Sequence, residues 1–167
     1  VLTLDDVEVN GRTVLLRVDL NSPLDPTTKA FLDDTRIRAI LPTLNRLSQA
    51  KVVILAHQSR PGKADFTSTL GHARELGRLL GRRVDWVDDV CGEHAMAAIE
   101  ALESGQVLML NNVRGHEEET SVKGGHAITG QTQLVERLSS VVDLYVNDAF
   151  ACAHRASPSI TGFAHHL

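Results

Sequence analysis

Residues 51–80 read KVVILAHQSRPGKADFTSTLGHARELGRLL, and this stretch decides the fold. Residues 51–56 are a short run of β-branched and leucine side chains, which is typical of a buried strand. Residues 57–68 contain a proline and a glycine and predict a loop. Residues 69–80 repeat apolar side chains at helical spacing. A strand, a polar loop and a helix in this order form the unit from which parallel sheets are built.

The same alternation continues through the rest of the chain. Further buried strands are predicted at residues 13–18, 83–87, 106–110 and 141–146. Further helices are predicted at residues 33–48, 92–103 and 131–139. Residues 111–130 are expected to form a long polar connection. The pattern predicts a single α/β domain with an open parallel sheet and helices on both faces, a Rossmann-like three-layer arrangement.

Length and composition exclude several classes of protein. The 167 residues are 43% hydrophobic and 23% charged, which is typical of one globular domain. A net charge of -4 gives no overall positive field for nucleic acid or an anionic membrane. Cys91 and Cys152 form no CxxC pair, and no run approaches the ~20 apolar residues of a membrane helix. We expect a soluble, cytoplasmic protein, and the ends at Val1 and Leu167 indicate a piece of a longer chain.

Basic side chains lie at or just beyond the carboxyl ends of several predicted strands. The stretches are RVDLN (17–21), AHQSRP (56–61), NNVRGH (111–116) and VNDAFACAHR (146–155). In an open parallel sheet these ends share one edge, where ligands bind. Because a guanidinium group matches the geometry of phosphate and carboxylate, the converging arginines predict a small, multiply charged anion as ligand.

Other polar residues have simpler interpretations. Arginines on predicted helix faces are interpreted as solvated surface: Arg38, Arg46 and Arg78. Asp19 either caps its own loop or contacts the ligand, and the sequence leaves both open. Asn147 and Asp148 are interpreted as structural residues that brace a turn.

The motifs of several common sites are missing from the sequence. No histidine spacing predicts a metal site, and no P-loop, nucleophile elbow or dinucleotide fingerprint occurs. Two other functions compete with a small-anion enzyme. A nucleic-acid module is disfavoured by an aromatic content of 4% and the negative net charge. The second competing function is that of a stand-alone sugar-phosphate binding protein or isomerase. An isomerase needs a base with a tuned pKa, and no carboxylate is an evident candidate.

Five blocks of sequence carry a family resemblance when they are taken together. They are RVDLNSPL (17–24), Arg36 with Ile37, AHQSRPGK (56–63), LNNVRGHEEE (110–119) and YVNDAFACAHRASPSITGF (145–163). In this order they resemble the signatures of the phosphoglycerate kinase family, and in detail its archaeal members. The resemblance covers residues 1–167 as the family's amino-terminal, substrate-binding domain, without the carboxy-terminal nucleotide domain.

The resemblance implies reversible phosphoryl transfer between ATP and the carboxylate of 3-phosphoglycerate, giving 1,3-bisphosphoglycerate and ADP in glycolysis and gluconeogenesis. It implies a monomeric enzyme in which the absent domain binds Mg-ATP or Mg-ADP and a hinge closes the two domains. This chain is then expected to bind the acid, to hold no metal or cofactor, and to show no turnover alone.

The resemblance also assigns site residues by motif. The expected substrate contacts are Asp19, Asn21, Arg36, His57, Arg60, Arg114 and Arg155, with Arg17 and His154 as secondary candidates. Arg36 is the expected catalytic residue, because it is placed to stabilise charge on the transferring group. The chain departs from the family pattern at several positions: HLGRP is here HQSRP, Gly115 replaces an aromatic residue, and Ser157 replaces a second histidine.

Overall fold

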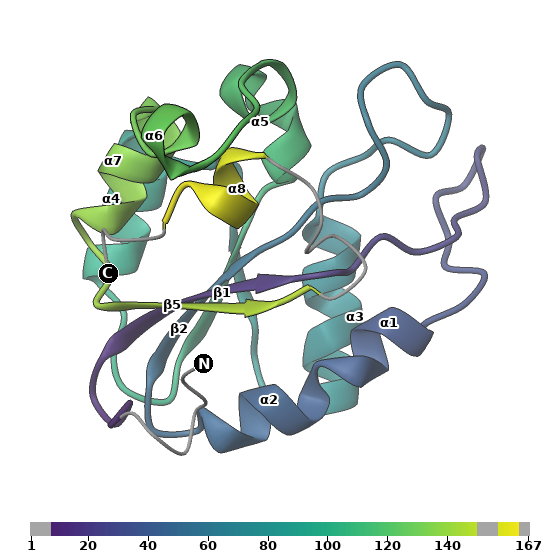
Figure 1. Ribbon diagram of the computed structural model, residues 1–167. Coiled ribbons are helices and arrows are strands. Elements are labelled where there is room, and N and C mark those ends of the chain that lie inside the picture. Colours follow the sequence, from purple (N-terminus) through teal and green to yellow (C-terminus); the bar gives the residue numbers. More distant parts are fainter. Residues whose placement is uncertain (1–7, 150–156, 164–167) are drawn as a thin grey trace.

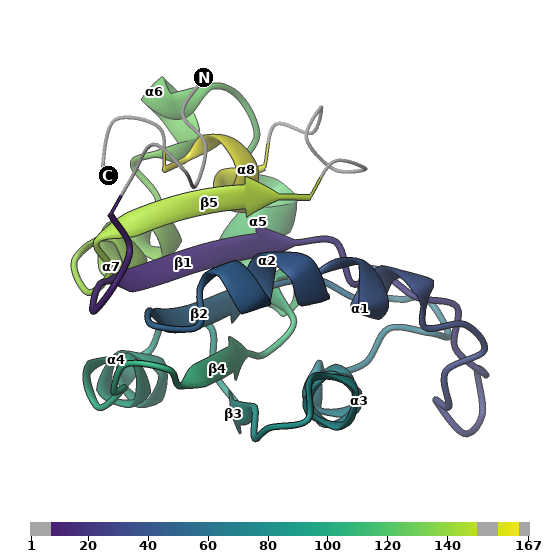
Figure 2. The same cartoon turned by 90° about the horizontal axis from the view of Figure 1, so that it is seen from below.

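A computed structural model describes residues 8–149 and 157–163, and within them all strands form one parallel sheet (Figure 1). The strands are β1 (Thr13–Val18), β2 (Lys51–Leu55), β3 (Asp85–Val87), β4 (Val107–Leu110) and β5 (Leu144–Asp148). Their order across the sheet is β3-β4-β2-β1-β5, which Figure 2 shows from below. The predicted open parallel sheet is confirmed.

Helices cover both faces of the sheet, as predicted (Figure 1). One face packs against α1 (Thr35–Ala39), α2 (Leu41–Arg46) and α3 (Leu70–Leu80). The other packs against α4 (Glu93–Glu100), α7 (Gln133–Ser139) and the segment of α8 (Pro158–Thr161). Short elements lie between β4 and α7: the 3-10 helix η2 (Val113–Gly115), α5 (Glu117–Ser121) and α6 (His126–Thr129).

The alternation of side chains along β1 divides the core into two parts. Val14 and Leu16 belong to the core under α1, α2 and α3. Leu15 belongs to the core under α4 and α7. Since successive side chains of a strand point to opposite faces, Arg17 shares the face of Leu15. Arg17 is only 1% exposed, so a charged group lies inside the second part of the core.

The predicted helix at residues 33–48 is two short helices. α1 ends at Ala39 and α2 begins at Leu41, with Pro42 in its first turn. Proline has no N–H to donate to the carbonyl four residues earlier, and it disfavours helical backbone at the residue before it. A proline is well tolerated in the first turn of a helix, so the chain starts a new helix there.

Three further predictions were wrong in detail. β3 and β5 are only partly buried, because both are edge strands. β5 begins at Leu144 instead of residue 141, and it extends through Asn147 to Asp148. The turn that these two residues were expected to brace lies outside the described residues. The connection 111–130 contains η2, α5 and α6, which are too short to leave a helical pattern in the sequence. Among the described residues, none of the helices has the length and apolar character needed to cross a membrane.

Candidate functional site

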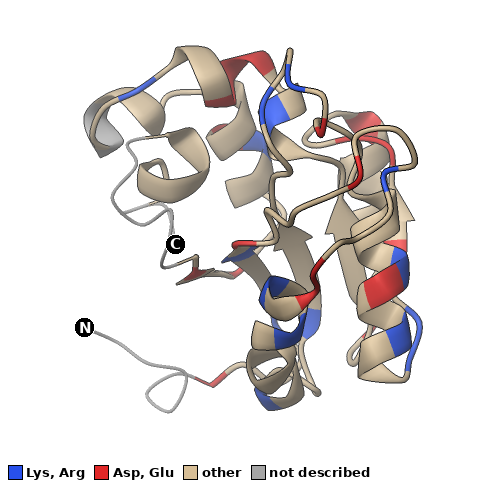
Figure 3. Ribbon diagram, turned by 90° about the vertical axis from the view of Figure 1, so that its right-hand side faces the viewer, with Lys and Arg blue, Asp and Glu red and all other residues tan. Residues whose placement is uncertain are grey.

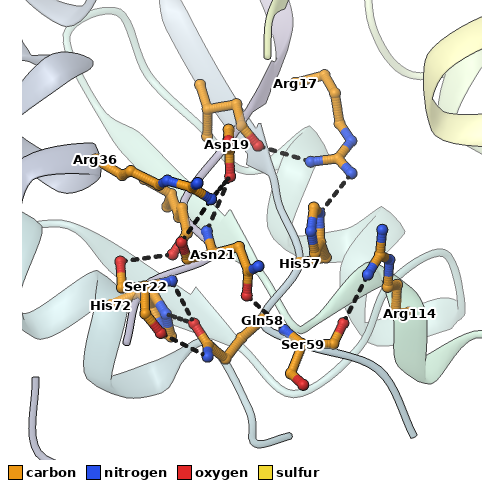
Figure 4. A network of polar contacts seen from close by, with 12 residues as sticks. Arg17, Asp19, Asn21, Ser22, Arg36, His57, Gln58, Ser59, His72 and Arg114 are labelled. Carbon is orange, nitrogen blue, oxygen red and sulfur yellow. Dashed lines mark hydrogen bonds and ion pairs between the residues drawn. The ribbon is translucent and has the colours of Figure 1, made fainter. Parts of the chain in front are cut away.

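A buried amide holds together the loops that follow β1 and β2. Gln58 is fully buried; its Oε1 accepts from the backbone N–H of Ser22 at 3.0 Å, and its Nε2 donates to the Ser22 carbonyl at 2.9 Å (Figure 4). The loop after β4 joins them, because Asn112 Nδ2 donates to the carbonyls of Gln58 and Thr67, both at 2.8 Å. Three loops at the carboxyl edge of the sheet therefore form one connected rim.

Ser59 connects two of the predicted site residues through its backbone. Its N–H donates to Asn21 Oδ1 at 2.8 Å, and its carbonyl accepts from Arg114 NH1 at 2.9 Å. Ser59 has a φ of 58°, the left-handed region that glycine adopts most easily. The family pattern has glycine at this position, so the departure to serine keeps an unusual backbone conformation that points the two peptide groups at Asn21 and Arg114.

A cavity of about 550 Å³ opens at this rim. Asn21, Arg60 and Arg114 line it, and so do Lys63 and Lys123. Figure 3 views the molecule from the side where the strands end and shows basic segments there among acidic ones. In the part of the chain that the structure describes, Arg60, Lys63 and Lys123 have no ion-pair partner. The cavity therefore offers positive charge to an anion.

Arg36 lies beside the cavity in α1. Its NH1 pairs with Asp19 Oδ1 at 3.0 Å and donates to the Asn21 carbonyl at 2.8 Å (Figure 4). Its side chain stays 47% exposed. The same Asp19 oxygen accepts from the backbone N–H of Asn21 at 3.1 Å. Asp19 therefore both caps its loop and orients Arg36, which accounts for its structural role; whether it also contacts a ligand stays a prediction.

Arg17 and His57 lie below the rim and do not line the cavity. They are 1% and 2% exposed, and Arg17 NH2 lies 2.9 Å from His57 Nδ1. Arg17 also donates from NH1 to its neighbouring carbonyl, Val18 O, at 2.6 Å. A residue as deeply buried as Arg17 is placed to support the site rather than to present its charge at the surface.

Two predicted site residues and several positions that were singled out in the sequence remain. Arg155 and His154 lie outside the described residues. Ser157, which replaces a second histidine of the family, lines the cavity and precedes α8. At Gly115 no atom lies within 4 Å of the place where a side chain would begin, so the missing aromatic leaves open space and not a packing defect. Asp148 accepts from Thr43 Oγ1 at 2.8 Å, in agreement with its structural interpretation.

Sequence reasoning missed several residues that line the cavity, among them Lys63, Asp65, Glu119 and Lys123. Lys63 and Lys123 add positive charge, and Glu119 contributes a carboxylate that is 3% exposed. Lys63 follows Arg60 by three residues in the same loop, which is a usable signal. Glu119 is the third glutamate of a run, and nothing in the sequence separates it from its exposed neighbour Glu117.

Glu119 is the titratable group that burial perturbs most clearly at the cavity. Removal from water raises the pKa of Glu119, while the charges of Arg17 and Arg114 act in the opposite direction. Both carboxylate oxygens are engaged by Ser159: Oε1 accepts from its backbone N–H at 2.8 Å, and Oε2 accepts from its hydroxyl in a short contact. The carboxylate is therefore directed toward α8 and away from an anion in the cavity.

Comparison with known proteins gives one consistent family. The family model described as "Phosphoglycerate kinase" matches residues 4–167. The chain is 50% identical over 166 residues to a phosphoglycerate kinase of Methanosarcina mazei and 46% identical over 164 residues to one of Methanobacterium bryantii. These alignments cover 99% and 97% of this chain but 39% and 40% of the relatives. The resemblance to archaeal members is thus confirmed.

A solved structure shows the same fold. The crystal structure of phosphoglycerate kinase from Pyrococcus horikoshii OT3 superposes with a TM-score of 0.93 at 43% identity. It covers 98% of this chain and 40% of that one. The chain therefore spans about 40% of the length of the relatives it matches.

Proposed function

The chain belongs to the phosphoglycerate kinase family, and we propose that it forms the acid-binding part of such an enzyme. The proposed reaction is the reversible transfer of a phosphoryl group between ATP and the carboxylate of 3-phosphoglycerate, giving 1,3-bisphosphoglycerate and ADP. In this proposal residues 1–167 form one substrate-binding domain of a cytoplasmic enzyme, and further chain, like that of the longer relatives, supplies the rest.

One observation carries the proposal: Asn21, Arg60 and Arg114, from three loops, line one cavity together with two lysines. A phosphate monoester has a charge of about -1.5 to -2 at neutral pH. The carboxylate, with a pKa of about 4, adds another negative charge. A site of this kind neutralises a small anion with several charges, and Arg36 stands beside it through its contact with Asn21.

The chemistry requires no general base. The attacking carboxylate is already ionised at neutral pH, so the protein has to position two anions and cancel charge on the group that moves between them. Guanidinium groups perform both tasks. We propose Arg36 for the charge that develops in the transition state, since its side chain is exposed and held at one end by Asp19. Binding of the acid is proposed for Asp19, Asn21, His57, Arg60, Arg114 and Arg155.

The magnesium nucleotide is proposed to bind outside this chain. Within residues 8–149 and 157–163, no group of three or more His, Cys, Asp or Glu side chains is arranged to hold a metal ion. The proposed role of this chain is limited to the acid.

Calorimetry with 3-phosphoglycerate and, separately, with Mg-ATP tests the proposal. We expect this chain to bind the acid weakly, to bind Mg-ATP negligibly, and to catalyse no turnover alone. A folded chain that releases no heat with 3-phosphoglycerate, at concentrations up to the millimolar range, rules the assignment out.

Replacing Arg36 tests its separate role. In the complete enzyme, we expect Arg36→Ala to lower kcat by on the order of 10² to 10³, the usual effect of removing one charge-stabilising donor. Binding of the acid should change much less. Arg60→Ala is the matched comparison and should mainly raise KM. An Arg36→Ala enzyme with a raised KM and an unchanged kcat contradicts the role.

Glu119 is the residue that would support a second candidate function, that of a sugar-phosphate isomerase. Such an enzyme needs a base with a raised pKa beside the ligand, and Glu119 lines the cavity with its pKa raised by burial. The contacts with Ser159 disfavour this role, because both carboxylate oxygens are already engaged. Proton exchange into a sugar phosphate, absent in Glu119→Gln, would favour the isomerase.

A further inference from the structure

A buried chain of hydrogen bonds connects α8 to His57. It runs from the Glu119 carboxylate to the Ser159 hydroxyl, from there to Arg17 Nε at 2.9 Å, and from Arg17 NH2 to His57 Nδ1 at 2.9 Å. Its members are 0% to 3% exposed. They come from α5, α8, β1 and the loop after β2, which are distant in sequence.

All the polar groups of Ser159 form hydrogen bonds with other residues. Its N–H and hydroxyl donate to Glu119, its hydroxyl oxygen accepts from Arg17, and its carbonyl accepts from Tyr145 Oη at 2.5 Å. Since the hydroxyl has a single proton, its donation to Glu119 leaves its lone pairs for Arg17. The chain of bonds therefore has one direction, and it aligns the Arg17 guanidinium.

The direction of the bonds also determines the state of the His57 ring. A guanidinium group has only N–H donors and keeps its proton in proteins. Where Arg17 NH2 lies 2.9 Å from His57 Nδ1, that nitrogen has to be the acceptor. A neutral imidazole with an accepting Nδ1 carries its proton on Nε2.

A purely structural reading of the same contacts is that Arg17 and Glu119 neutralise each other in the core. That interpretation explains the hydrogen bond from Arg17 to Ser159. It does not explain why Arg17 donates a second N–H to the imidazole of His57. The Arg17 contact with His57 places the end of the chain on a residue of the loop that forms the rim.

We propose that Glu119, Ser159 and Arg17 are positioning residues, which act through this chain of bonds to hold His57 as the Nε2–H tautomer in one orientation. The consequence for ligand binding rests on the proposed function, in which His57 contacts the acid. The tautomer itself is a property of the free protein. Shifting α8 would then alter the donor that His57 presents.

The nitrogen-15 spectrum of the His57 ring tests the proposal in the intact protein without any ligand. The His57 signals are assigned by their loss in His57→Gln. We expect an unprotonated Nδ1 and a protonated Nε2 in the native protein, and a mixture of tautomers in Ser159→Ala. Ser159→Thr keeps a hydroxyl and should restore the native pattern. Ser140→Ala, which removes an exposed hydroxyl bonded to Arg137 O, is the matched control and should change nothing.

Binding of 3-phosphoglycerate supplies the second readout. Loss of the hydroxyl should weaken it by on the order of tenfold, the effect of one hydrogen bond to a charged group. A native His57 with its proton on Nδ1 overturns the proposal, even if Ser159→Ala does not fold. An unchanged tautomer in folded Ser159→Ala also overturns it. If neither the native protein nor any variant binds the acid, the proposed function is wrong, but the result on the His57 tautomer remains valid.

Discussion

The two faces of the sheet bury polar groups of different kinds. Under α3 the buried groups are neutral: His72 Nε2 lies 2.9 Å from Gln58 Oε1, and burial lowers the pKa of His72 to about 4. On the opposite face Arg17 and Glu119 form a charged pair bridged by Ser159. The neutral group joins loops to each other, whereas the charged group joins a loop to α8.

The two faces should respond to acid in opposite directions. His72 has a lower pKa in the folded state than in the unfolded state, so its contribution to stability is present above about pH 6.5 and is lost as the pH falls toward 4. Burial raises the pKa of Glu119, so its contribution is present below its unfolded pKa and is lost as the pH rises through the folded value. Whether each buried group stabilises the protein therefore depends on the pH.

The largest effect on stability is expected on the charged face. Arg17→Met should lower the free energy of unfolding by about 3–5 kcal/mol, because it removes the larger of the two positive charges that act on the buried Glu119 carboxylate and leaves only Arg114. Chemical unfolding at pH 7 measures it. The double variant Arg17→Met with Glu119→Gln should recover part of the loss. If the single variant loses less than about 1 kcal/mol, the pair is not the organising feature of this face.

The second-largest expected effect is the pH dependence of stability on the neutral face. Between pH 6.5 and 4 the native protein should lose roughly 3 kcal/mol through His72, since each pKa unit corresponds to about 1.4 kcal/mol. His72→Gln keeps a donor near Gln58 and should remove most of this slope. The measurement is unfolding by denaturant at several pH values. Parallel curves for the two proteins would show that another group titrates.

Gln58→Leu restores the common family residue and sharpens the comparison further. It should cost about 1–3 kcal/mol, because the backbone groups of Ser22 and the ring of His72 lose a buried partner. Thermal unfolding reports the change. If stability is unchanged or increased, the loops can close over an apolar side chain at this position, where the common family pattern has leucine.

The smallest effect is expected at a position that belongs to neither face. Gly115→Phe restores the family aromatic in open space, and stability should change by no more than about 0.5 kcal/mol. Binding of 3-phosphoglycerate should also remain within about twofold of the native value, a difference of about 0.4 kcal/mol. A large loss in either measurement would show that the loop near Arg114 tolerates less than its geometry indicates.

The sequence predicted the order of strands and helices because local periodicity reports which side chains are buried. It failed where the decision is made by distant partners. β5 starts and ends where its pairing with β1 allows, with Asp148 opposite Val18. The interior position of Arg17 depends on Ser159, 142 residues away. No local pattern shows such a partner.

The candidate site was predictable to the same degree. Asn21, Arg60 and Arg114 were expected at one edge, and the structure places them around one cavity. Glu119 was missed because a buried and an exposed glutamate look alike in a run of three. The family resemblance named Arg17 as a secondary candidate for the site, but only the structure shows that it is buried.

The position of β1 between β2 and β5 has a consequence for synthesis on the ribosome. β1 can pair with β2 soon after both are made, but its other neighbour, β5, follows only after about 130 residues, the separation of the Thr13 and Asp143 contact. Until then one side of β1 has unpaired N–H and C=O groups and can pair with another nascent chain. β5 thus covers the open side of β1, and truncation before residue 144 would leave that side unpaired.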